Sequence, residues 1–456
     1  MSANSESTES VTASPDRQTR GRWPWTATAG TGRPVWPPVV LVTLVAAALA
    51  WVRMPTFVAG QLYAEDGKYF VGQFLGRGWS VLWTPYAGYQ HLIPRVATAL
   101  VADLLPAAWW AVAVNALACL AVGGVAGLVF LFSRDIVTFW PSRLALGFIA
   151  VLTPVAGLEA IGNLANLHWF LLYLTPWLLL ATPRSTIGAS AMAEVAALCT
   201  GTEPQCAIFL PLVIWRIVQS RRTWPVAAGW LVGFAAQVIT TLISPRAVAT
   251  HYPPLASTVE GYVLNAGMTL GTTNQVILGR LILGAGWWIG VAGVAAIIAV
   301  AVLGAVRGGL MVRVAIASLL WGSVASWAAS FVLGSNPALF YSHQTDEQLR
   351  GPLLVRWGTA ASMLLVATIP VAVGALVQRY PRWRPAGAGL LVAMLLIMAG
   401  NLFPAPAPEP PSWWTAVEQT ESVCRTKPYA TIKVVASPPD WLVPVPCSWL
   451  VGSPAG

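Results

Sequence analysis

The segment Tyr63–Phe70, with the sequence YAEDGKYF, carries two adjacent carboxylates, Glu65 and Asp66, followed by Lys68 in an aromatic setting. Beside a membrane surface a carboxylate is partly desolvated, which raises its basicity, while a neighbouring cation keeps it ionised. That combination suits a general base. Because adjacent residues do not share a face of a helix or strand, the two acids are not expected to form a facing acid–base pair. The alternative is that the acids cap the loop or pair with Lys68.

The chain around this segment is too apolar for a water-soluble protein. Of its 456 residues 56% are apolar and 9% are charged, whereas soluble domains carry about 25% charged residues. Apolar runs of roughly 17 to 25 residues, each long enough to cross a bilayer, recur along it. We therefore predict an all-α polytopic membrane protein. The net charge of +9 does not indicate a nucleic-acid partner, because no block of five or six basic residues occurs.

The apolar runs predict about eleven transmembrane helices. The expected spans cover residues 35–52, 107–132, 142–158, 167–182, 187–201, 206–219, 225–243, 276–304, 314–334, 352–378 and 386–403. The two runs that flank Gly201–Pro204 are short enough to form a helical hairpin that enters the bilayer only in part.

Three regions follow from this pattern. Residues 1–33 contain almost no large aliphatic residues and are expected to be a disordered tail on the cytoplasmic side. Residues 34–403 form the polytopic domain, which includes a long loop at 53–106, and residues 404–456 form an outer tail. The first apolar run follows a long polar leader, so we expect a retained anchor and no cleaved signal peptide.

The distribution of cations predicts the orientation. With the N-terminus inside, fifteen of the 26 Lys and Arg residues fall in the N-terminal tail and in short loops of one side. Such loops are cytoplasmic in most membrane proteins, so we expect a cytoplasmic-membrane protein with its N-terminus inside and its C-terminus outside. The long outer segments are expected to fold over the membrane surface; they are 53–106, 244–275, 335–351 and the tail.

Two of the five cysteines, Cys424 and Cys447, share the outer tail, where an oxidising compartment permits a disulfide. Between them Thr431–Val435 has the pattern of a short strand. The simplest interpretation is a small stapled cap without a catalytic role. The other cysteines lie in predicted spans and are expected to behave as small apolar residues; they are Cys119, Cys199 and Cys206.

An acidic pair just beyond the first span of a polytopic protein resembles the GT-C superfamily of membrane glycosyltransferases. More closely, three features look like a group of bacterial membrane proteins with a GT-C-like layout, commonest in actinobacteria. They are the run AEDGKYF…PYAGYQHLIPR at 64–95, the run GNLANLHWFLLYL at 162–174, and the cysteine-containing tail. The resemblance covers most of the chain in layout and some thirty residues in detail.

The resemblance implies a transfer reaction at the outer membrane face. In that superfamily the donor is usually a sugar on a polyprenyl phosphate, and we expect an envelope glycan or lipid as the acceptor, with membrane lipids around the protein. The loop acid activates the acceptor hydroxyl, in some members together with a divalent cation such as Mg²⁺ or Mn²⁺. Carried onto this sequence, Asp66 is the best match for that acid and Glu65 the second.

Such a reaction also needs cations, because negative charge develops on the departing phosphate. The cations expected near the outer boundary are Lys68, Arg95, Arg246, Arg350 and Arg356. His91, in the same loop as Arg95, is a further candidate substrate contact. For Arg350 and Arg356 the alternative is that they only extend to lipid headgroups, as cations near span ends usually do.

A polar cluster lies where the third and fourth spans are expected to meet the outer surface. Asn163, Asn166 and His168 can hydrogen-bond sugar hydroxyls, and Trp169 can stack on a sugar ring; Glu159 lies one turn earlier. The alternative is that these groups hydrogen-bond between helices.

Other chemistries have little support. The sequence contains no HExxH, HxxxH or CxxC spacing, no Walker A motif, no dinucleotide fingerprint and no nucleophile elbow. A transporter or flippase of a lipid-linked glycan is the main alternative, and a non-catalytic membrane protein the second. A transporter usually shows ionisable residues near the bilayer midplane, and here only Glu194 is expected to lie deep.

Overall fold

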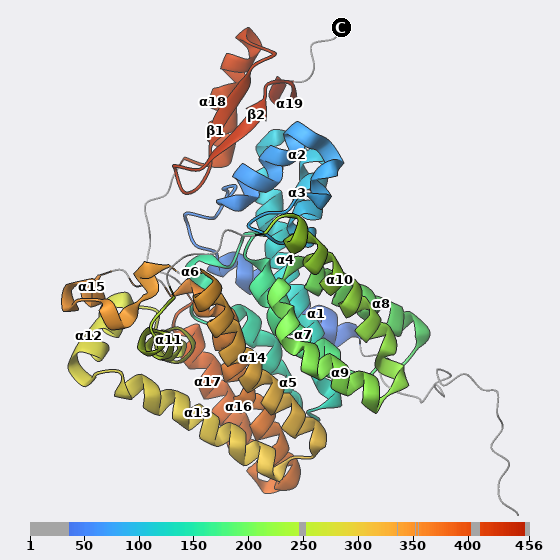
Figure 1. Cartoon of the computed structure of the whole chain (residues 1–456), viewed down its shortest axis with the longest axis vertical. Helices are drawn as coiled ribbons and strands as arrows, with labels where there is room; N and C mark the ends of the chain where they lie inside the picture. Colours follow the sequence, from blue (N-terminus) through green and yellow to red (C-terminus); the bar gives the residue numbers. More distant parts are fainter. Residues whose placement is uncertain are drawn as a thin grey trace, which may run out of the picture.

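A computed structural model of the protein describes residues 36–245, 252–334, 336–351, 353, 355–402 and 411–451. These residues form nineteen α-helices and one two-stranded sheet (Figure 1). The all-α membrane class is therefore confirmed in outline. The predicted disordered tail at 1–33 and the candidate cation Arg246 lie outside the described residues.

Seven of the described helices are long and apolar enough to cross a membrane. Their α-helical cores are α1 (Trp36–Arg53), α4 (Trp110–Phe132), α10 (Trp224–Ile243), α13 (Trp288–Arg307), α14 (Leu310–Gly334), α16 (Thr359–Arg379) and α17 (Arg384–Ala399). Four further predicted spans correspond to shorter helices, namely α5 (Trp140–Leu152), α7 (Leu167–Leu180), α8 (Thr186–Thr202) and α9 (Leu210–Gln219). The structure thus supports a membrane protein with seven span-length helices among the described residues, and the full count of eleven is not confirmed.

The prediction of a single span at 276–304 is wrong. The segment divides into α12 (Gln275–Ala285) and α13, and Gly286 between them has a φ of +65°. A left-handed residue ends a helix, and glycine adopts it without strain. Hydropathy alone did not distinguish this break, because both helices are apolar.

The long segments between spans contain short helices. Loop 53–106 carries α2 (Gly72–Arg77) and α3 (Leu92–Leu104), and α6 (Ala156–Glu159) precedes α7. The described part of 244–275 carries α11 (Leu255–Tyr262), and 335–351 carries α15 (Asp346–Arg350). The described parts of these segments are therefore folded, with α2 and α3 next to the C-terminal part of the chain and α11 and α15 at one side of the helical body (Figure 1).

Close packing of small residues holds the span-length helices together. A Cβ atom added at Gly123 of α4 would lie 2.4 Å from the carbonyl oxygen of Thr43 in α1, and one at Gly304 of α13 would lie 2.4 Å from Cβ of Ala372 in α16. Small residues at such crossings allow the backbones to approach, which is how membrane helices gain contact area. The helix α16 lies in the middle of the bundle and is almost wholly buried.

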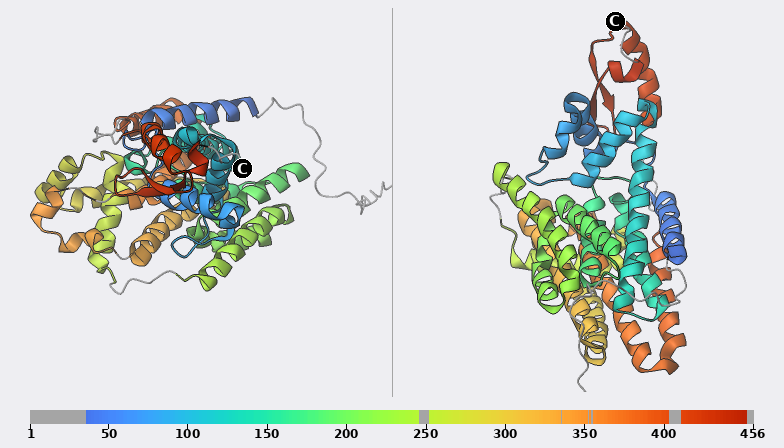
Figure 2. Two further views of the ribbon diagram at one scale, coloured as in Figure 1. Left: turned by 90° about the horizontal axis from the view of Figure 1, so that it is seen from above. Right: turned by 90° about the vertical axis from the view of Figure 1, so that its right-hand side faces the viewer.

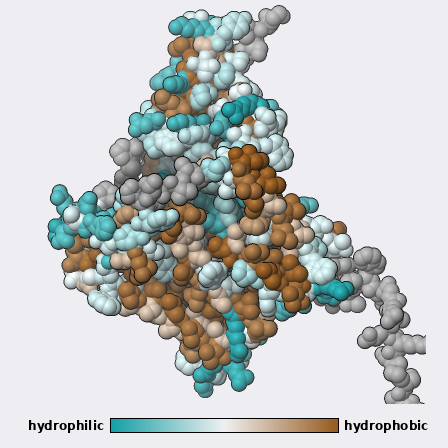
Figure 3. Space-filling model, in the orientation of Figure 1, coloured by the Kyte–Doolittle hydropathy of each residue, from teal (hydrophilic) through white to brown (hydrophobic). Residues whose placement is uncertain are grey.

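The two ends of the bundle differ in charge. One end, here called the arginine end, carries Arg134, Arg143, Arg184, Arg216, Arg221, Arg222, Arg307, Arg313, Arg379, Arg382 and Arg384 at its helix termini. The opposite end carries the C-terminal unit and loop 53–106 (Figure 2). Brown apolar side chains cover much of the helical body, whereas teal and white ones are more frequent towards the C-terminal unit (Figure 3).

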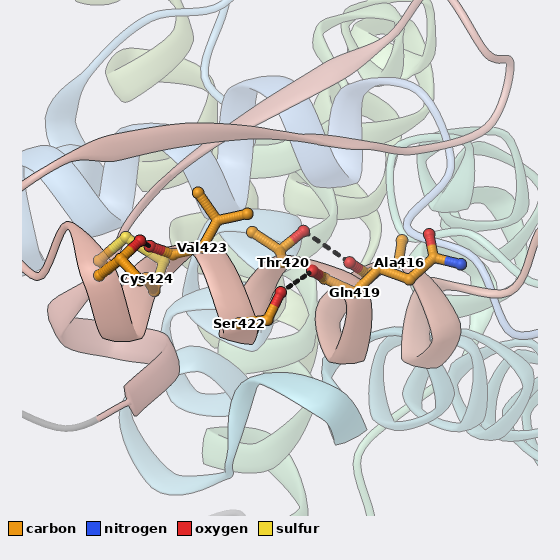
Figure 4. Close-up of a disulfide and its surroundings, with 8 residues drawn as sticks. Ala416, Gln419, Thr420, Ser422, Val423 and Cys424 are labelled. Carbon is orange, nitrogen blue, oxygen red and sulfur yellow. Dashed lines mark hydrogen bonds between the residues drawn. A yellow bond between two sulfur atoms is a disulfide. The ribbon is translucent and has the colours of Figure 1, made fainter.

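The C-terminal unit consists of α18 (Trp413–Thr426), β1 (Thr431–Val435), β2 (Leu442–Pro446) and α19 (Ser448–Val451). The strands pair antiparallel, with Thr431 opposite Pro446. The predicted strand and the predicted disulfide between Cys424 and Cys447 are both present, the latter at the end of α18 (Figure 4).

This unit is docked on loop 53–106. The indole N–H of Trp413 donates to the carbonyl oxygen of Ala107 at 2.8 Å, and the backbone N–H of Ala64 donates to that of Ser437 at 2.6 Å. Gly67 lies so close to β2 that an added Cβ would be 2.8 Å from a methyl group of Val443. The unit therefore clamps the segment that carries Glu65 and Asp66.

Removing the disulfide should loosen this clamp. The bond joins residues 23 positions apart, and closing a loop of that length stabilises a folded unit by roughly 3 kcal/mol on the chain-entropy model. We expect the double variant Cys424→Ser/Cys447→Ser to be cleaved faster than the wild type within 427–446 by limited proteolysis. Reducing agent should accelerate cleavage of the wild type only; equal rates for both proteins without reductant would contradict this stabilising role.

Candidate functional site

A cavity of about 530 Å³ lies between loop 53–106, the start of α7, the ends of α10 and α14, and the segment that leads into α16. Its volume is in the range of small-molecule sites in proteins. Its polar wall carries Glu65, His91, Glu159, Asn166, His168, Glu203, Gln205, Ser330 and Arg356. Its aromatic wall carries Tyr86, Tyr89, Trp169 and Trp357.

The cavity brings together about half of the residues that the sequence singled out. Those that line it are Glu65, His91, Asn166, His168, Trp169 and Arg356. Those that do not line it are Asp66, Lys68, Arg95, Asn163 and Arg350. Segments far apart in the chain therefore meet here, as a binding site requires.

Asp66 occupies a different position from the one expected of a catalytic base. Its side chain is fully buried, and its two oxygens accept the backbone N–H groups of Leu164 at 2.7 Å and Ala165 at 2.8 Å. Burial raises the pKa of this carboxyl to about 7, although the two backbone N–H groups oppose the shift. Asp66 thus ties loop 53–106 to the segment before α7, and its oxygens are not presented to the cavity.

Glu65 is the acid of the pair that faces the cavity. It is half-buried, and one oxygen accepts a hydrogen bond from the hydroxyl of Tyr86 at 3.3 Å. Within the described residues it forms no ion pair. The amine of Lys68 instead lies over the rings of Tyr69 and Trp441, at 5.5 and 5.2 Å from their centroids, and the alternative in which Lys68 pairs with one of the acids is not formed among the described residues.

A second carboxylate, Glu159, forms an ion pair with Arg356. One oxygen accepts hydrogen bonds from the guanidinium of Arg356 and from the hydroxyl of Tyr63. The guanidinium also lies 5.2 Å from the ring centroid of Trp357. Arginine has five donors, and among the described residues Arg356 uses only one of them, so it keeps donors for a ligand anion. Burial, with the charge of Glu159 next, raises the pKa of the Tyr63 hydroxyl well above its usual value.

A third carboxylate, Glu203, orients His168. The Nδ1–H of His168 donates to one oxygen of Glu203, and the other oxygen accepts the backbone N–H of Gln205 at 2.6 Å. A carboxylate on Nδ1 leaves Nε2 as the ring nitrogen that is free to accept a proton or a hydrogen bond. Glu203 was not among the predicted site residues, although the break GTEP between two short apolar runs marked its position.

His91 is buried at the cavity wall, and neither ring nitrogen has a hydrogen-bond partner among the described residues. The rings of Phe70, Tyr86 and Tyr89 surround it, with centroids 5.4, 5.4 and 4.2 Å away. Burial, together with the charges of His168 and Arg95, holds the pKa of this imidazole well below its usual value. His91 is therefore a neutral imidazole without a hydrogen-bond partner in the described part of the chain.

The other predicted substrate contacts either form hydrogen bonds within the protein or lie away from the cavity. The amide of Asn163 donates to the carbonyl oxygen of Glu159 at 2.6 Å and accepts the backbone N–H of Asn166 at 2.9 Å, which stabilises the turn before α7. Arg95 is buried and donates to Gln73 at 3.0 Å. Arg350 is exposed at the end of α15, away from the cavity lining. A role in substrate binding at this cavity is thus not supported for these residues.

The acids and histidines of the cavity do not converge on a common point. Within the described residues there is no group of three or more His, Cys, Asp or Glu side chains that could hold a metal ion.

The sequence matches no protein-family model, and no curated protein matches it significantly.

Proposed function

We propose that the protein is a GT-C-type membrane glycosyltransferase that transfers a sugar from a polyprenyl-phosphate donor to a cell-envelope acceptor. The observation that carries the proposal is the composition of the 530 Å³ cavity. The cavity is lined by Glu65, Arg356 and several aromatic rings. Glu65 is a carboxylate without an ion-pair partner among the described residues, and Arg356 is a guanidinium with donors to spare for a ligand.

In this mechanism Glu65 takes the proton of the acceptor hydroxyl. The hydroxyl oxygen then attacks the anomeric carbon of the donor sugar, and the bond between that carbon and the phosphate oxygen breaks. The polyprenyl phosphate leaves with one more negative charge, which Arg356 stabilises. Glu65 replaces Asp66 as the proposed base, because Asp66 is engaged by two backbone N–H groups.

Other cavity residues fit the binding of a sugar. The free nitrogen of His168 and the side chain of Asn166 supply polar contacts for hydroxyl groups. Trp169 supplies a flat apolar face. His91 lines the cavity as a neutral ring with both of its nitrogens buried. Hydrogen bonds to such groups fix the orientation of a ligand, while the aromatic area provides most of the contact.

The proposal includes an eleven-span topology. In it the short helices α5, α7, α8 and α9 also cross the bilayer, the arginine end faces the cytoplasm and the cavity opens at the outer face. This orientation follows the positive-inside rule, since the arginines at helix ends gather opposite the C-terminal unit.

The direct test uses wild-type protein in proteoliposomes with a panel of labelled polyprenyl-phosphate sugars and an envelope-lipid extract as the acceptor source. We expect a labelled product with a new glycosidic bond and release of free polyprenyl phosphate. Vectorial movement of the lipid-linked sugar without a new bond would instead identify a transporter or flippase. Failure of every donor on the panel to react or move would contradict both.

Replacing Arg356 by glutamine should weaken the use of the donor. Charge-assisted hydrogen bonds contribute about 1.5–3 kcal/mol, so we expect kcat/KM for the polyprenyl-phosphate sugar to fall by roughly 10- to 150-fold. The measurement is steady-state transfer at varied donor concentration. Arg350→Gln, an exposed arginine outside the cavity, is the matched control and should transfer at the wild-type rate. Equal values for the two variants would remove Arg356 from the phosphate site.

A further inference from the structure

A second cavity, of about 550 Å³, lies at the arginine end between α13, α16 and α17. Its walls are mostly aliphatic, with Leu303 from α13, Val373 and Leu376 from α16, and Leu390 from α17. Leu303 and Leu390 are 47% and 50% exposed, so this apolar surface is not covered by the described protein. In a membrane-spanning bundle, such a surface faces lipid.

Two guanidinium groups line the same cavity. Arg307, at the end of α13, donates to the hydroxyl of Tyr380 and lies 5.9 Å from the centroid of its ring, which fixes its position. Arg382 stands in the turn between α16 and α17, next to Trp383. The cavity thus combines an aliphatic wall with a cationic rim at one helix terminus.

Neither guanidinium has an acidic partner. Within the described residues Arg307 and Arg382 form no ion pair, and the cavity lining contains no Asp or Glu. The acid paired at this end is Asp135, which already contacts Arg134 and Arg184. Two cations without acidic partners among the described residues, next to an apolar wall, fit a ligand with an anionic head and an aliphatic tail.

We propose that this cavity is a binding site for one anionic phospholipid. The phosphate lies between Arg307 and Arg382, and an acyl chain lies along the wall formed by Leu303, Val373 and Leu390. Trp383 sits at the depth of the headgroup, where indole rings are favoured. The site is separate from the cavity that contains Glu65 and does not depend on the proposed transfer reaction.

Charge also argues against the other occupants of such a surface. A symmetric contact with a second copy of this chain would bring the arginines of the two copies into one interface, which is unfavourable for like charges. Free phosphate would satisfy the guanidinium groups but would leave the aliphatic wall uncovered. A lipid phosphate satisfies both parts of the cavity.

The test compares phosphatidylglycerol with phosphatidylcholine of identical acyl chains, bound to the purified full chain in detergent and measured by native mass spectrometry. Each cation near a lipid phosphate favours binding about fivefold, so we expect the double variant Arg307→Gln/Arg382→Gln to lose roughly 30-fold in phosphatidylglycerol affinity. Arg384→Gln, which replaces an exposed arginine at the start of α17 that does not line the cavity, is the matched control and should keep the preference for phosphatidylglycerol.

A second variant separates the apolar wall from the charge. Ala386→Trp places a bulky side chain in the cavity and leaves both arginines in place, so it should also weaken phosphatidylglycerol binding. Unchanged selectivity in the double arginine variant would overturn the proposal. So would thermal stabilisation by inorganic phosphate alone equal to that by the lipid, or a lipid-free dimer that Ala386→Trp abolishes.

Discussion

Substituting Glu65 by glutamine should lower the rate of sugar transfer by a factor of roughly 10²–10⁴, the usual contribution of a positioned general base. Glutamine keeps the size and the hydrogen bond from Tyr86 but cannot accept the hydroxyl proton at neutral pH. The loss should therefore appear in kcat, while KM for the donor changes little, since the donor phosphate is held elsewhere. Single-turnover transfer from the preferred donor is the measurement.

Two controls make this result specific. Glu347→Gln removes an exposed carboxylate of α15 that does not line the cavity, and it should leave kcat unchanged. The unfolding temperature of Glu65→Gln should match that of the wild type, because the Glu65 carboxylate has no ion pair to lose among the described residues. Undiminished transfer by Glu65→Gln would eliminate Glu65 as the base.

The largest effect on stability is expected at Arg53, the last residue of α1. Its side chain is fully buried and donates to the carbonyl oxygens of Val151, Thr153 and Pro154, which lie at the C-terminal end of α5. The carbonyl oxygens of Thr153 and Pro154 also accept the backbone N–H groups of Ala156 and Gly157, at 3.1 and 3.2 Å. Hydrogen bonds from a charged group contribute about 1.5–3 kcal/mol each, so Arg53→Met, which removes three of them, should destabilise the fold by roughly 3–5 kcal/mol. Thermal unfolding in detergent measures it.

A milder variant covers the case in which Arg53→Met fails to fold. A Cβ at Gly157 would lie 2.7 Å from two nitrogens of the guanidinium, so Gly157→Ala should displace the group and lower the unfolding temperature by a smaller amount. Arg77→Met, at an exposed position in the adjoining loop, is the control. If Arg53→Met and Arg77→Met unfold at the same temperature, the buried hydrogen bonds do not stabilise the fold.

Local features of the fold were predictable because they depend on nearby residues. The strand Thr431–Val435 and the bond between Cys424 and Cys447 follow from composition and from cysteine usage, and both are present. The apolar character of the spans is also a local property. The break at Gly286 was not predictable by hydropathy, because the apolar runs on its two sides are continuous and only the backbone conformation ends the helix.

The candidate site depends on contacts between distant segments, and such contacts were harder to predict from the sequence. The family resemblance favoured Asp66 as the base, with Glu65 second. Which of them faces the cavity is decided by the N–H groups of Leu164 and Ala165, about a hundred residues away. Glu203 was missed for the same reason, since only the folded chain places it beside His168.

The clamp on the segment around Glu65 also has a consequence for biosynthesis. Ala64 and Gly67 rest on Ser437 and Val443, which the ribosome adds after every helix of the bundle. A nascent chain stalled before this point would carry the acid on an unsupported loop. Maturation of the cavity is thus coupled to completion of the polypeptide, so half-made molecules in the membrane would lack a finished cavity wall.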